Sequence, residues 1–318
     1  MATSQDTVSS GLPPSDWMAE LPEKLHTWPL MKLAIPGSHN SATFGIDPKA
    51  ECAPDAPTNV ANSVRVPVLG EAVRAVCRAW SVCQKLDFRQ QLESGIRYFD
   101  LRISTKPGSE DFYFVHTLYG PKLSEMLESV SSYLSEHRKE VVLLDLNHFY
   151  GMEEEHHAML LSLLTSHFGE KLMPCGDPRQ VTLRHMWDLD KQVLVFYQHD
   201  LASSFTEVWP ASSIIAPWAN TPHEEQCLQF LSQRFDQPQP DHFVVCQGIL
   251  SPTPSHFLNV SSSLESMVCR FRPRIYSWIS QRAATHPYSL NIVMVDFAQG
   301  GDFVQRVLSL NLTRAEAK

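Results

Sequence analysis

The chain of 318 residues is 43% hydrophobic and 19% charged, which is the composition of a globular protein with a sizeable core. Its formal net charge of -9 gives no overall field to attract nucleic acid or an anionic membrane, so no nucleic-acid partner is expected and any lipid contact must be local. The sequence shows neither a signal-peptide pattern at its start nor an apolar stretch of about 18 residues, so no membrane-spanning helix is expected.

Short apolar runs recur along the chain, with helical patterns or polar loops between them. The runs begin at Leu33, Ile96, Phe112, Val141, Gln192, Ile214, Phe243 and Asn291. They are continuous rather than alternating, which is typical of strands that are buried on both faces in a parallel sheet. The sequence therefore predicts about eight such strands.

Helical spacing of apolar residues between the third and the fourth run predicts a helix over 122–140, as expected for a crossover between two parallel strands. Further helices are expected over 153–168, 224–235, 264–282 and 303–310. The stretch 48–65 is rich in Pro, Ala, Asp and Asn and has no period, so it is predicted to be a loop at the rim of a site.

Eight strands with intervening helices predict an α/β fold, namely a single distorted TIM (β/α)8-type barrel. The barrel is expected to be irregular, because little room for a helix exists between Tyr197 and Ile214. A doubly wound open sheet is the alternative, but no G-x-G-x-x-G or Walker-type loop supports it. The barrel domain is expected over 15–312, with flexible ends at 1–14 and 313–318.

The C-terminal ends of barrel strands meet on one face, where the active site of a TIM barrel lies. The side chains expected there are His39, Asn40, Asp100, Arg102, His116, Asn147, Tyr197, His199, Trp218, Gln247 and Asp296. Two histidines, an arginine and an aspartate on one rim suit in-line phosphoryl transfer. One imidazole accepts a proton from the attacking oxygen, the other protonates the leaving oxygen, and the arginine neutralises charge on the phosphate.

Several of these residues also have a structural interpretation. Asp100 and Arg102 alternate with Leu101 and so face the same side of one strand, where Asp100 would equally suit a salt bridge to neighbouring strands. The run of acidic residues and histidines at 153–157 fits the first turn of a helix better than a metal site, because its spacing is not H-E-x-x-H. The seven cysteines have no metal-ligand spacing and indicate reduced thiols in a cytosolic protein. No metal or other cofactor is expected.

The motifs IPGSHNS, GIRYFDLRI, FVH and VVLLDLNHF, in that order, resemble the X-domain of phosphatidylinositol-specific phospholipases C. From Ser15 through VDFAQGGDFV the chain is similar to the short animal PI-PLC X-domain-containing proteins, which lack the PH, EF-hand, Y and C2 regions of the large signalling enzymes. The resemblance implies a distorted TIM barrel with an X-box core at 27–200. It also implies a phosphoric diester hydrolase that cleaves phosphatidylinositol into diacylglycerol and an inositol (cyclic) phosphate.

The resemblance implies a role for each of four residues. His39 would activate the inositol 2-hydroxyl, His116 would protonate the diacylglycerol oxygen, and Asp296 would be the carboxylate behind His39. Arg102 stands where the large animal enzymes have a calcium-binding carboxylate, and arginine cannot ligate calcium. An arginine there resembles the calcium-independent bacterial enzymes, so activity without calcium is expected.

Head-group contacts are expected from Asn40, Asp100, Asn147, Tyr197, His199, Trp218 and Gln247. Asn40 departs from the aspartate that the short group and the bacterial enzymes usually carry, which leaves a catalytically weak binding module for phosphoinositides or inositol phosphates as the alternative function. Glycerophosphodiester phosphodiesterase chemistry ranks last, because it needs a carboxylate-rich metal site that this sequence does not offer. The expected location is the cytoplasm with peripheral membrane contact, and no obligate protein partner is expected.

Overall fold

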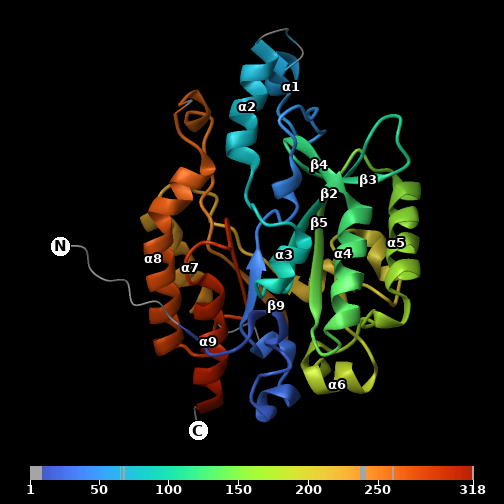
Figure 1. The fold of residues 1–318 in the computed structure, drawn as a ribbon, viewed down its shortest axis with the longest axis vertical. Coiled ribbons are helices and arrows are strands. Elements are labelled where there is room, and N and C mark those ends of the chain that lie inside the picture. Colours follow the sequence, from blue (N-terminus) through green and yellow to red (C-terminus); the bar gives the residue numbers. More distant parts are fainter. Residues whose placement is uncertain (1–8, 65, 67–68, 237–240, 260, 317–318) are drawn as a thin grey trace, which may run out of the picture.

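The computed structural model describes residues 9–64, 66, 69–236, 241–259 and 261–316 (Figure 1). Its strands are β1 Ile35–Ser38, β2 Tyr98–Thr105, β3 Phe112–His116, β4 Leu118–Lys122, β5 Val142–Tyr150, β6 Val193–Tyr197, β7 Trp209–Pro210, β8 Ile214–Ile215, β9 Phe243–Gln247 and β10 Ile292–Val295. Its α-helices are α1 Thr58–Val64, α2 Leu69–Ser81, α3 Phe88–Glu93, α4 Leu123–Glu136, α5 Glu154–Phe168, α6 Leu183–Asp188, α7 Glu224–Phe235, α8 Leu264–Thr285 and α9 Phe303–Glu316.

Eight parallel strands form a nearly closed barrel, which confirms the predicted TIM-type fold over the open doubly wound sheet. The strands are hydrogen-bonded in the order β7-β6-β5-β2-β1-β10-β9-β8, and each neighbouring pair runs parallel. Between Tyr197 and Ile214 the chain makes two short 3-10 turns and strand β7, without an α-helix. The predicted irregularity therefore lies where the two end strands, β7 and β8, follow each other in sequence.

One of the runs predicted as a barrel strand is not part of the barrel. The run at Phe112 forms β3, which pairs antiparallel with β2 and with β4 in a hairpin above the barrel. The eighth parallel strand is instead β7, which has only two residues and so gives no apolar run in the sequence. Helix α4 still connects parallel strands, β2 and β5, but the hairpin precedes it (Figure 1).

The five predicted helices are present as α4, α5, α7, α8 and α9. Helices α1, α2, α3 and α6 were not predicted. Part of the expected loop at 48–65 is helix α1, whose sequence TNVANSV lacks apolar periodicity, and residue 65 lies outside the described residues. Helices α1 and α2 stand at the same end of the barrel as the β3–β4 hairpin (Figure 1).

The described ends of the chain pack against the barrel domain, and the flexibility expected for 1–14 and 313–318 stays a prediction. Ser10 is buried, and its backbone N–H donates to Oε1 of Gln305 in α9 at 3.2 Å. Helix α9 continues through Glu316, and the guanidinium of Arg314 is buried under the carbonyls of Lys32 and Leu290. Residues 1–8 and 317–318 lie outside the described residues.

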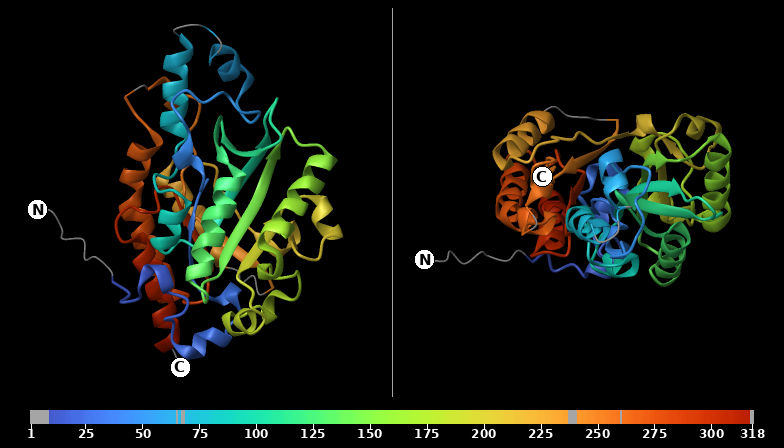
Figure 2. Two further views of the ribbon diagram at one scale, coloured as in Figure 1. Left: turned by 45° about the vertical axis from the view of Figure 1, so that its right-hand side comes forward. Right: turned by 90° about the horizontal axis from the view of Figure 1, so that it is seen from above.

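Alternate strand residues face the barrel interior and the surrounding helices. Tyr98, Phe196 and Met294 pack in one buried cluster with the N-terminal segment around Trp17. Their strand neighbours, such as Leu101 and Val195, pack in a second cluster with the helices that surround the strands (Figure 2). This two-residue alternation decides which polar side chains reach the site. None of the described helices is both long and apolar enough to cross a membrane.

Candidate active site

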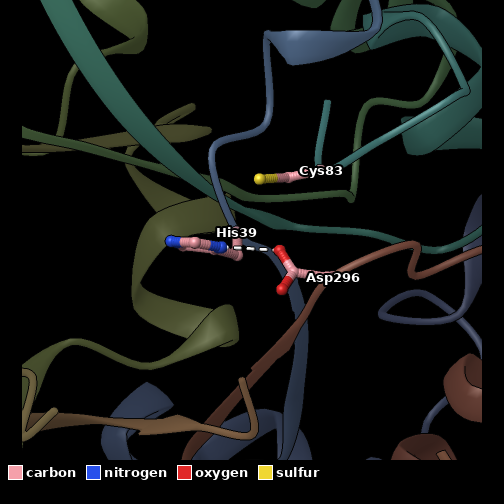
Figure 3. A group of neighbouring side chains, drawn as sticks. All are labelled: His39, Cys83 and Asp296. Carbon is pink, nitrogen blue, oxygen red and sulfur yellow. Dashed lines mark hydrogen bonds and ion pairs between the residues drawn. The ribbon is translucent and has the colours of Figure 1, made fainter. Parts of the chain in front are cut away.

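His39 and Asp296 meet at the C-terminal ends of two neighbouring strands. His39 directly follows β1, Asp296 directly follows β10, and the last residues of these strands, Ser38 and Val295, are paired. Nδ1 of His39 lies 2.6 Å from Oδ1 of Asp296 (Figure 3). A carboxylate in this position holds the imidazole as the tautomer with a proton on Nδ1, so that Nε2 carries the lone pair.

His116 reaches the same place from the β3–β4 hairpin. Its ring centroid lies 6.5 Å from that of His39, and its Nδ1 lies 2.7 Å from the carbonyl oxygen of Ser81, to which it donates. Burial and the charge of Arg102 lower the pKa of His116 to about 3. His116 is therefore neutral near pH 7, with the lone pair on Nε2.

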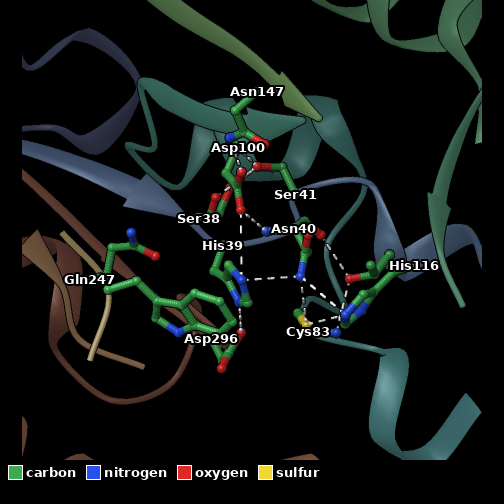
Figure 4. Close-up of polar contacts among 12 residues, drawn as sticks. Ser38, His39, Asn40, Ser41, Cys83, Asp100, His116, Asn147, Gln247 and Asp296 are labelled. Atoms are coloured by element: carbon green, nitrogen blue, oxygen red, sulfur yellow. Dashed lines mark hydrogen bonds and ion pairs between the residues drawn. The ribbon is translucent and has the colours of Figure 1, made fainter. Parts of the chain in front are cut away.

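The amide of Asn40 lies between the two imidazoles (Figure 4). Its Nδ2 is 3.1 Å from Nε2 of His39 and 3.5 Å from Nε2 of His116, so it donates toward both lone pairs. The backbone of Asn40 has a φ of 43°, in the left-handed region that asparagine tolerates better than most residues. Its buried Oδ1 has no hydrogen-bond partner.

Asp100 connects Asn40 to the strand β5. Its Oδ2 accepts from the backbone N–H of Asn40 at 2.7 Å, and its Oδ1 accepts from Nδ2 of Asn147 at 2.5 Å. Burial opposes ionisation, but His39, Arg102 and these donors together hold the pKa of Asp100 below its ordinary value. Asp100 thus positions the loop after β1 and forms no ion pair with a lysine or arginine among the described residues.

Arg102 is the basic residue of the site. It lines two adjoining cavities, of about 400 Å³ and about 250 Å³, whose walls both include His39 and Trp218. The larger one also holds Asp100, Asn147 and Gln247, and the smaller one also holds His116 and Asp296. Nε of Arg102 is buried and has no hydrogen-bond partner.

Two other predicted contacts line the larger cavity. The indole of Trp218 is 51% exposed and donates to Oγ of Ser251 at 2.9 Å, which places an aromatic face at the opening. Nε2 of Gln247 donates to the carbonyl of Ala216 at 2.8 Å, which leaves its Oε1 free of any described partner. Both side chains therefore line the larger cavity, and their contact with a substrate stays a prediction.

Tyr197 and His199 are not brought to the site, contrary to the prediction. Tyr197 is paired with Leu146 on the outer face of the sheet, and its hydroxyl is bonded to Nδ1 of His157 at 2.7 Å. The His199 ring stacks on His157 with centroids 3.7 Å apart. Gln198, between them, faces inward and lines the larger cavity. Because every residue of β6 is apolar and buried, the sequence did not reveal that Gln198 and not its neighbours would turn inward.

Two further neighbours of the site, Gln84 and Cys83, were not predicted. Nε2 of Gln84 donates to the carbonyls of His39 at 2.9 Å and Val295 at 3.0 Å, so one side chain ties together the loops that carry His39 and Asp296. The thiol of Cys83 lines the smaller cavity, 3.6 Å from Nδ2 of Asn40. Both residues lie in the connection after α2, where neither spacing nor periodicity marks them.

The donor set does not fit a calcium ion. Calcium requires about six to eight oxygen ligands. Asp100 lies next to Asn40 and Asn147, but both of its oxygens already accept hydrogen bonds, and the guanidinium of Arg102 lines the same cavity.

Comparisons with known proteins identify the family of the chain. Residues 76–199 match the model for the X domain of phosphatidylinositol-specific phospholipase C. The chain is 40% identical over 316 residues to PI-PLC X domain-containing protein 3 of Homo sapiens, covering 98% of this chain and 97% of that protein.

Solved structures with a similar fold include the phosphatidylinositol-specific phospholipases C of Listeria monocytogenes and Staphylococcus aureus. The first has a TM-score of 0.67 and 16% identity, and the match covers 94% of this chain and 99% of that chain. The second has a TM-score of 0.65 and 17% identity, with 96% and 99% covered. The fold is thus that of a phospholipase C-like barrel. The chain belongs to the PI-PLC X domain-containing proteins.

Proposed function

We propose that this protein is a calcium-independent phosphatidylinositol-specific phospholipase C. The observation that carries the proposal is the pair of imidazoles: Nε2 of His39 and Nε2 of His116 both face the amide of Asn40, and Arg102 lines the cavities beside them. Acid–base catalysis across a phosphate needs two such groups on opposite sides of one reacting centre, with a cation for the phosphate charge.

In the proposed reaction, Nε2 of His39 accepts the proton of the inositol 2-hydroxyl while that oxygen attacks phosphorus. The bond from phosphorus to the diacylglycerol oxygen breaks, and protonated His116 gives its proton to that oxygen. Asp296, which accepts from Nδ1 of His39, stabilises the imidazolium that forms. Hydrolysis of the cyclic phosphate would use the same groups in reverse, with His116 accepting a proton from water and His39 returning one to the 2-oxygen.

This scheme requires His116 to be protonated when substrate is bound. Burial and Arg102 disfavour its charged form, so that its pKa is about 3. A phosphodiester anion beside Arg102 would offset the charge of the guanidinium and attract a proton to Nε2 of His116. We infer that substrate binding itself raises the pKa of His116 into the working range.

The larger cavity supplies the proposed contacts for the inositol ring. Asp100, Asn147 and Gln247 bring acceptors and donors for hydroxyl groups, and Trp218 brings an exposed aromatic face at its opening. The remaining lipid would stay in the bilayer, which implies peripheral membrane contact by the face that carries the β3–β4 hairpin. We further propose a cytoplasmic location and a role in lipid degradation.

Turnover of labelled phosphatidylinositol with EDTA present tests the proposal. Wild-type protein should release diacylglycerol and an inositol cyclic phosphate, and the double variant His39→Ala/His116→Ala should not. If the folded wild-type protein binds phosphatidylinositol vesicles but releases no product with or without calcium, the site is a binding module for the inositol phosphate group.

A further inference from the structure

Cys83 forms a compact group with the two residues of the proposed base. One ligand atom each from His39, Cys83 and Asp296 lie within 4.8 Å of one another (Figure 3). Among the described residues this is the only group of three or more histidine, cysteine and acidic side chains close enough to hold one metal ion. The thiol donates to the carbonyl of Ser81 at 3.5 Å and accepts from Nδ2 of Asn40 at 3.6 Å, and the proposed reaction has no use for it.

The three ligands come from three separate segments whose backbones are tied together. His39 follows β1, Asp296 follows β10, and Cys83 follows α2. The backbone N–H of Cys83 donates to Oγ1 of Thr43 at 2.9 Å, and its carbonyl accepts from the backbone N–H of Phe297 at 2.7 Å. The thiol is therefore fixed in place relative to the loops that carry the other two ligands.

We propose that His39, Cys83 and Asp296 bind a zinc ion, or a divalent ion of similar thiolate preference, which inhibits the protein. Imidazole, thiolate and carboxylate are the ligands of protein zinc sites, and the smaller cavity, of about 250 Å³, leaves room for a water molecule as the fourth ligand. This ion would not be a cofactor, because it occupies the base that the reaction needs. Its binding does not depend on the proposed activity, but its inhibitory effect rests on the proposed function.

The geometry needs only small movements of side chains. Zinc bonds of about 2.0 to 2.3 Å in a tetrahedron place ligand atoms roughly 3.3 to 3.7 Å apart. Nδ1 of His39 and Oδ1 of Asp296, now 2.6 Å apart, would open slightly around the ion, while Sγ of Cys83 would move closer. The thiol proton leaves to solvent when the zinc–sulfur bond forms.

Asn40 suits the change of tautomer that zinc requires. A metal on Nδ1 moves the imidazole proton to Nε2, which then faces Nδ2 of Asn40 at a present distance of 3.1 Å, donor against donor. Rotation of the Asn40 amide by half a turn would present Oδ1 to that proton, and this oxygen has no other partner. The same asparagine can therefore satisfy either tautomer of His39.

Arg102 makes the site selective among cations. Its guanidinium lines the same cavity and repels any ion held by charge alone. A thiolate bond offsets this repulsion for zinc and cobalt, whereas calcium prefers oxygen ligands and gains little from sulfur. We therefore expect zinc to bind and calcium not to compete.

Titration of the full chain with Co²⁺, followed by optical absorption, tests the site directly. Wild-type protein should bind one Co²⁺ with a near-ultraviolet thiolate-to-cobalt band, and one equivalent of Zn²⁺, but not excess Ca²⁺, should abolish the band. Cys83→Ala should lose the band and Asp296→Asn should weaken Co²⁺ binding at least about tenfold. The matched control Cys77→Ser removes another buried thiol, one that lies outside this group, and should retain the band.

The outcomes separate the two proposals. The zinc site is overturned if folded Cys83→Ala keeps the thiolate band or if wild type lacks it. This holds whether or not the protein turns over phosphatidylinositol. If Cys83→Ala does not fold, loss of Co²⁺ binding in folded Asp296→Asn decides the question, and full retention there overturns the site. A band without phosphatidylinositol turnover leaves the metal site standing and defeats the proposed function. Where turnover exists, Zn²⁺ should inhibit wild type and Cys77→Ser but not Cys83→Ala.

Discussion

The side chain of Asn40 lies between the two histidines of the site. Its amide faces Nε2 of both histidines, at 3.1 Å and 3.5 Å. An aspartate of the same size would form an ion pair with Arg102 and orient its guanidinium toward the phosphate. Its negative charge would also favour protonation of His116. Both effects favour turnover, whereas repulsion between the new carboxylate and the phosphate disfavours it.

We predict that Asn40→Asp raises the turnover of phosphatidylinositol, because orientation of Arg102 outweighs the repulsion. Arg102→Ala should lower turnover by at least about 100-fold, which is typical for the loss of one preorganised charge-stabilising donor. Both variants are measured on one substrate at low and moderate salt, with circular dichroism as the folding control. Equal turnover by wild type and Arg102→Ala would remove the arginine from the mechanism.

His116 should make the fold sensitive to acid. In the unfolded chain the pKa of His116 is about 6.5, whereas burial and the charge of Arg102 lower its pKa in the folded protein to about 3. Because the unfolded state then binds more protons, stability falls as the pH drops below 6.5 and the loss levels off below 3. At pH 5 the loss amounts to about 2 kcal/mol.

The free energy of unfolding of wild type and His116→Gln, measured in urea at pH 7.5 and pH 5, isolates this contribution. Glutamine can still donate to the carbonyl of Ser81 but does not titrate. We expect wild type to lose more stability than the variant between these two pH values. The same loss in both proteins would show that His116 has an ordinary pKa.

At the scale of elements, Gln84 holds together the ends of β1 and β10. It donates to the carbonyls of His39 and Val295, and its Oε1 accepts from the N–H of Ala298 at 3.1 Å. Gln84→Met keeps the length of the side chain but leaves these groups unpaired. We predict about 1 to 3 kcal/mol lower stability and roughly tenfold lower kcat, with little change in KM.

Gln192→Met is the matched control for this variant. Gln192 is equally buried and donates to the carbonyls of His137 and Glu140, away from the site. It should lose similar stability while kcat stays at the wild-type value. If both variants have the same kcat, Gln84 has no positioning role beyond its contribution to folding.

The sequence predicted the elements that have strong periodicity and missed those that depend on tertiary contacts. The parallel strands other than β7 and the helices α4, α5, α7, α8 and α9 were evident from apolar runs and helical spacing, whereas α2, with 13 residues, was not predicted. Strand β7, with two residues, owes its place to pairing with β6, and helix α3, with six residues, to the capping box that Asp87 forms with Gln90. The antiparallel direction of β3 follows from the reversal of the chain between Thr105 and Phe112, where Gly108 has a φ of 78°, and an apolar run does not encode this reversal.

The candidate site was predicted more completely than its surroundings. His39, Arg102, His116 and Asp296 lie around the same cavity. Tyr197 and His199 were misplaced because the sequence alone did not fix the inward face of β6. Gln84 and Cys83 could not be predicted, since their roles arise from the approach of α2 to the strand ends.

For the whole molecule, a buried ion pair fastens the N-terminal segment to the barrel. Arg97 and Glu140 are fully buried, with 2.8 Å between Nη2 and Oε2. Arg97 also donates to the carbonyl of Ser15, and Glu140 accepts from the backbone N–H of Met18. The ion pair therefore contacts the segment that begins at residue 15, which is the proposed start of the barrel domain.

We predict that Arg97→Met lowers the free energy of unfolding by about 3 to 5 kcal/mol, because it leaves the Glu140 carboxyl buried without its partner. Hydrogen exchange should rise first at residues 15–19. Arg89→Met, which breaks a partly exposed pair with Glu136 on the surface of α4, is the matched control and should change stability far less. Similar losses in both variants would contradict an anchoring role for Arg97.

In the proposed mechanism His39 is the general base and His116 is the general acid. Turnover of substrates with different leaving groups tests this assignment most directly. Turnover is compared between phosphatidylinositol and an analogue that releases an acidic phenol, which needs no protonation. His116→Ala should lose about 100-fold or more on phosphatidylinositol yet stay within roughly tenfold of wild type on the analogue. His39→Ala should be inactive on both. An equal loss of both substrates by His116→Ala would contradict its assignment as the general acid.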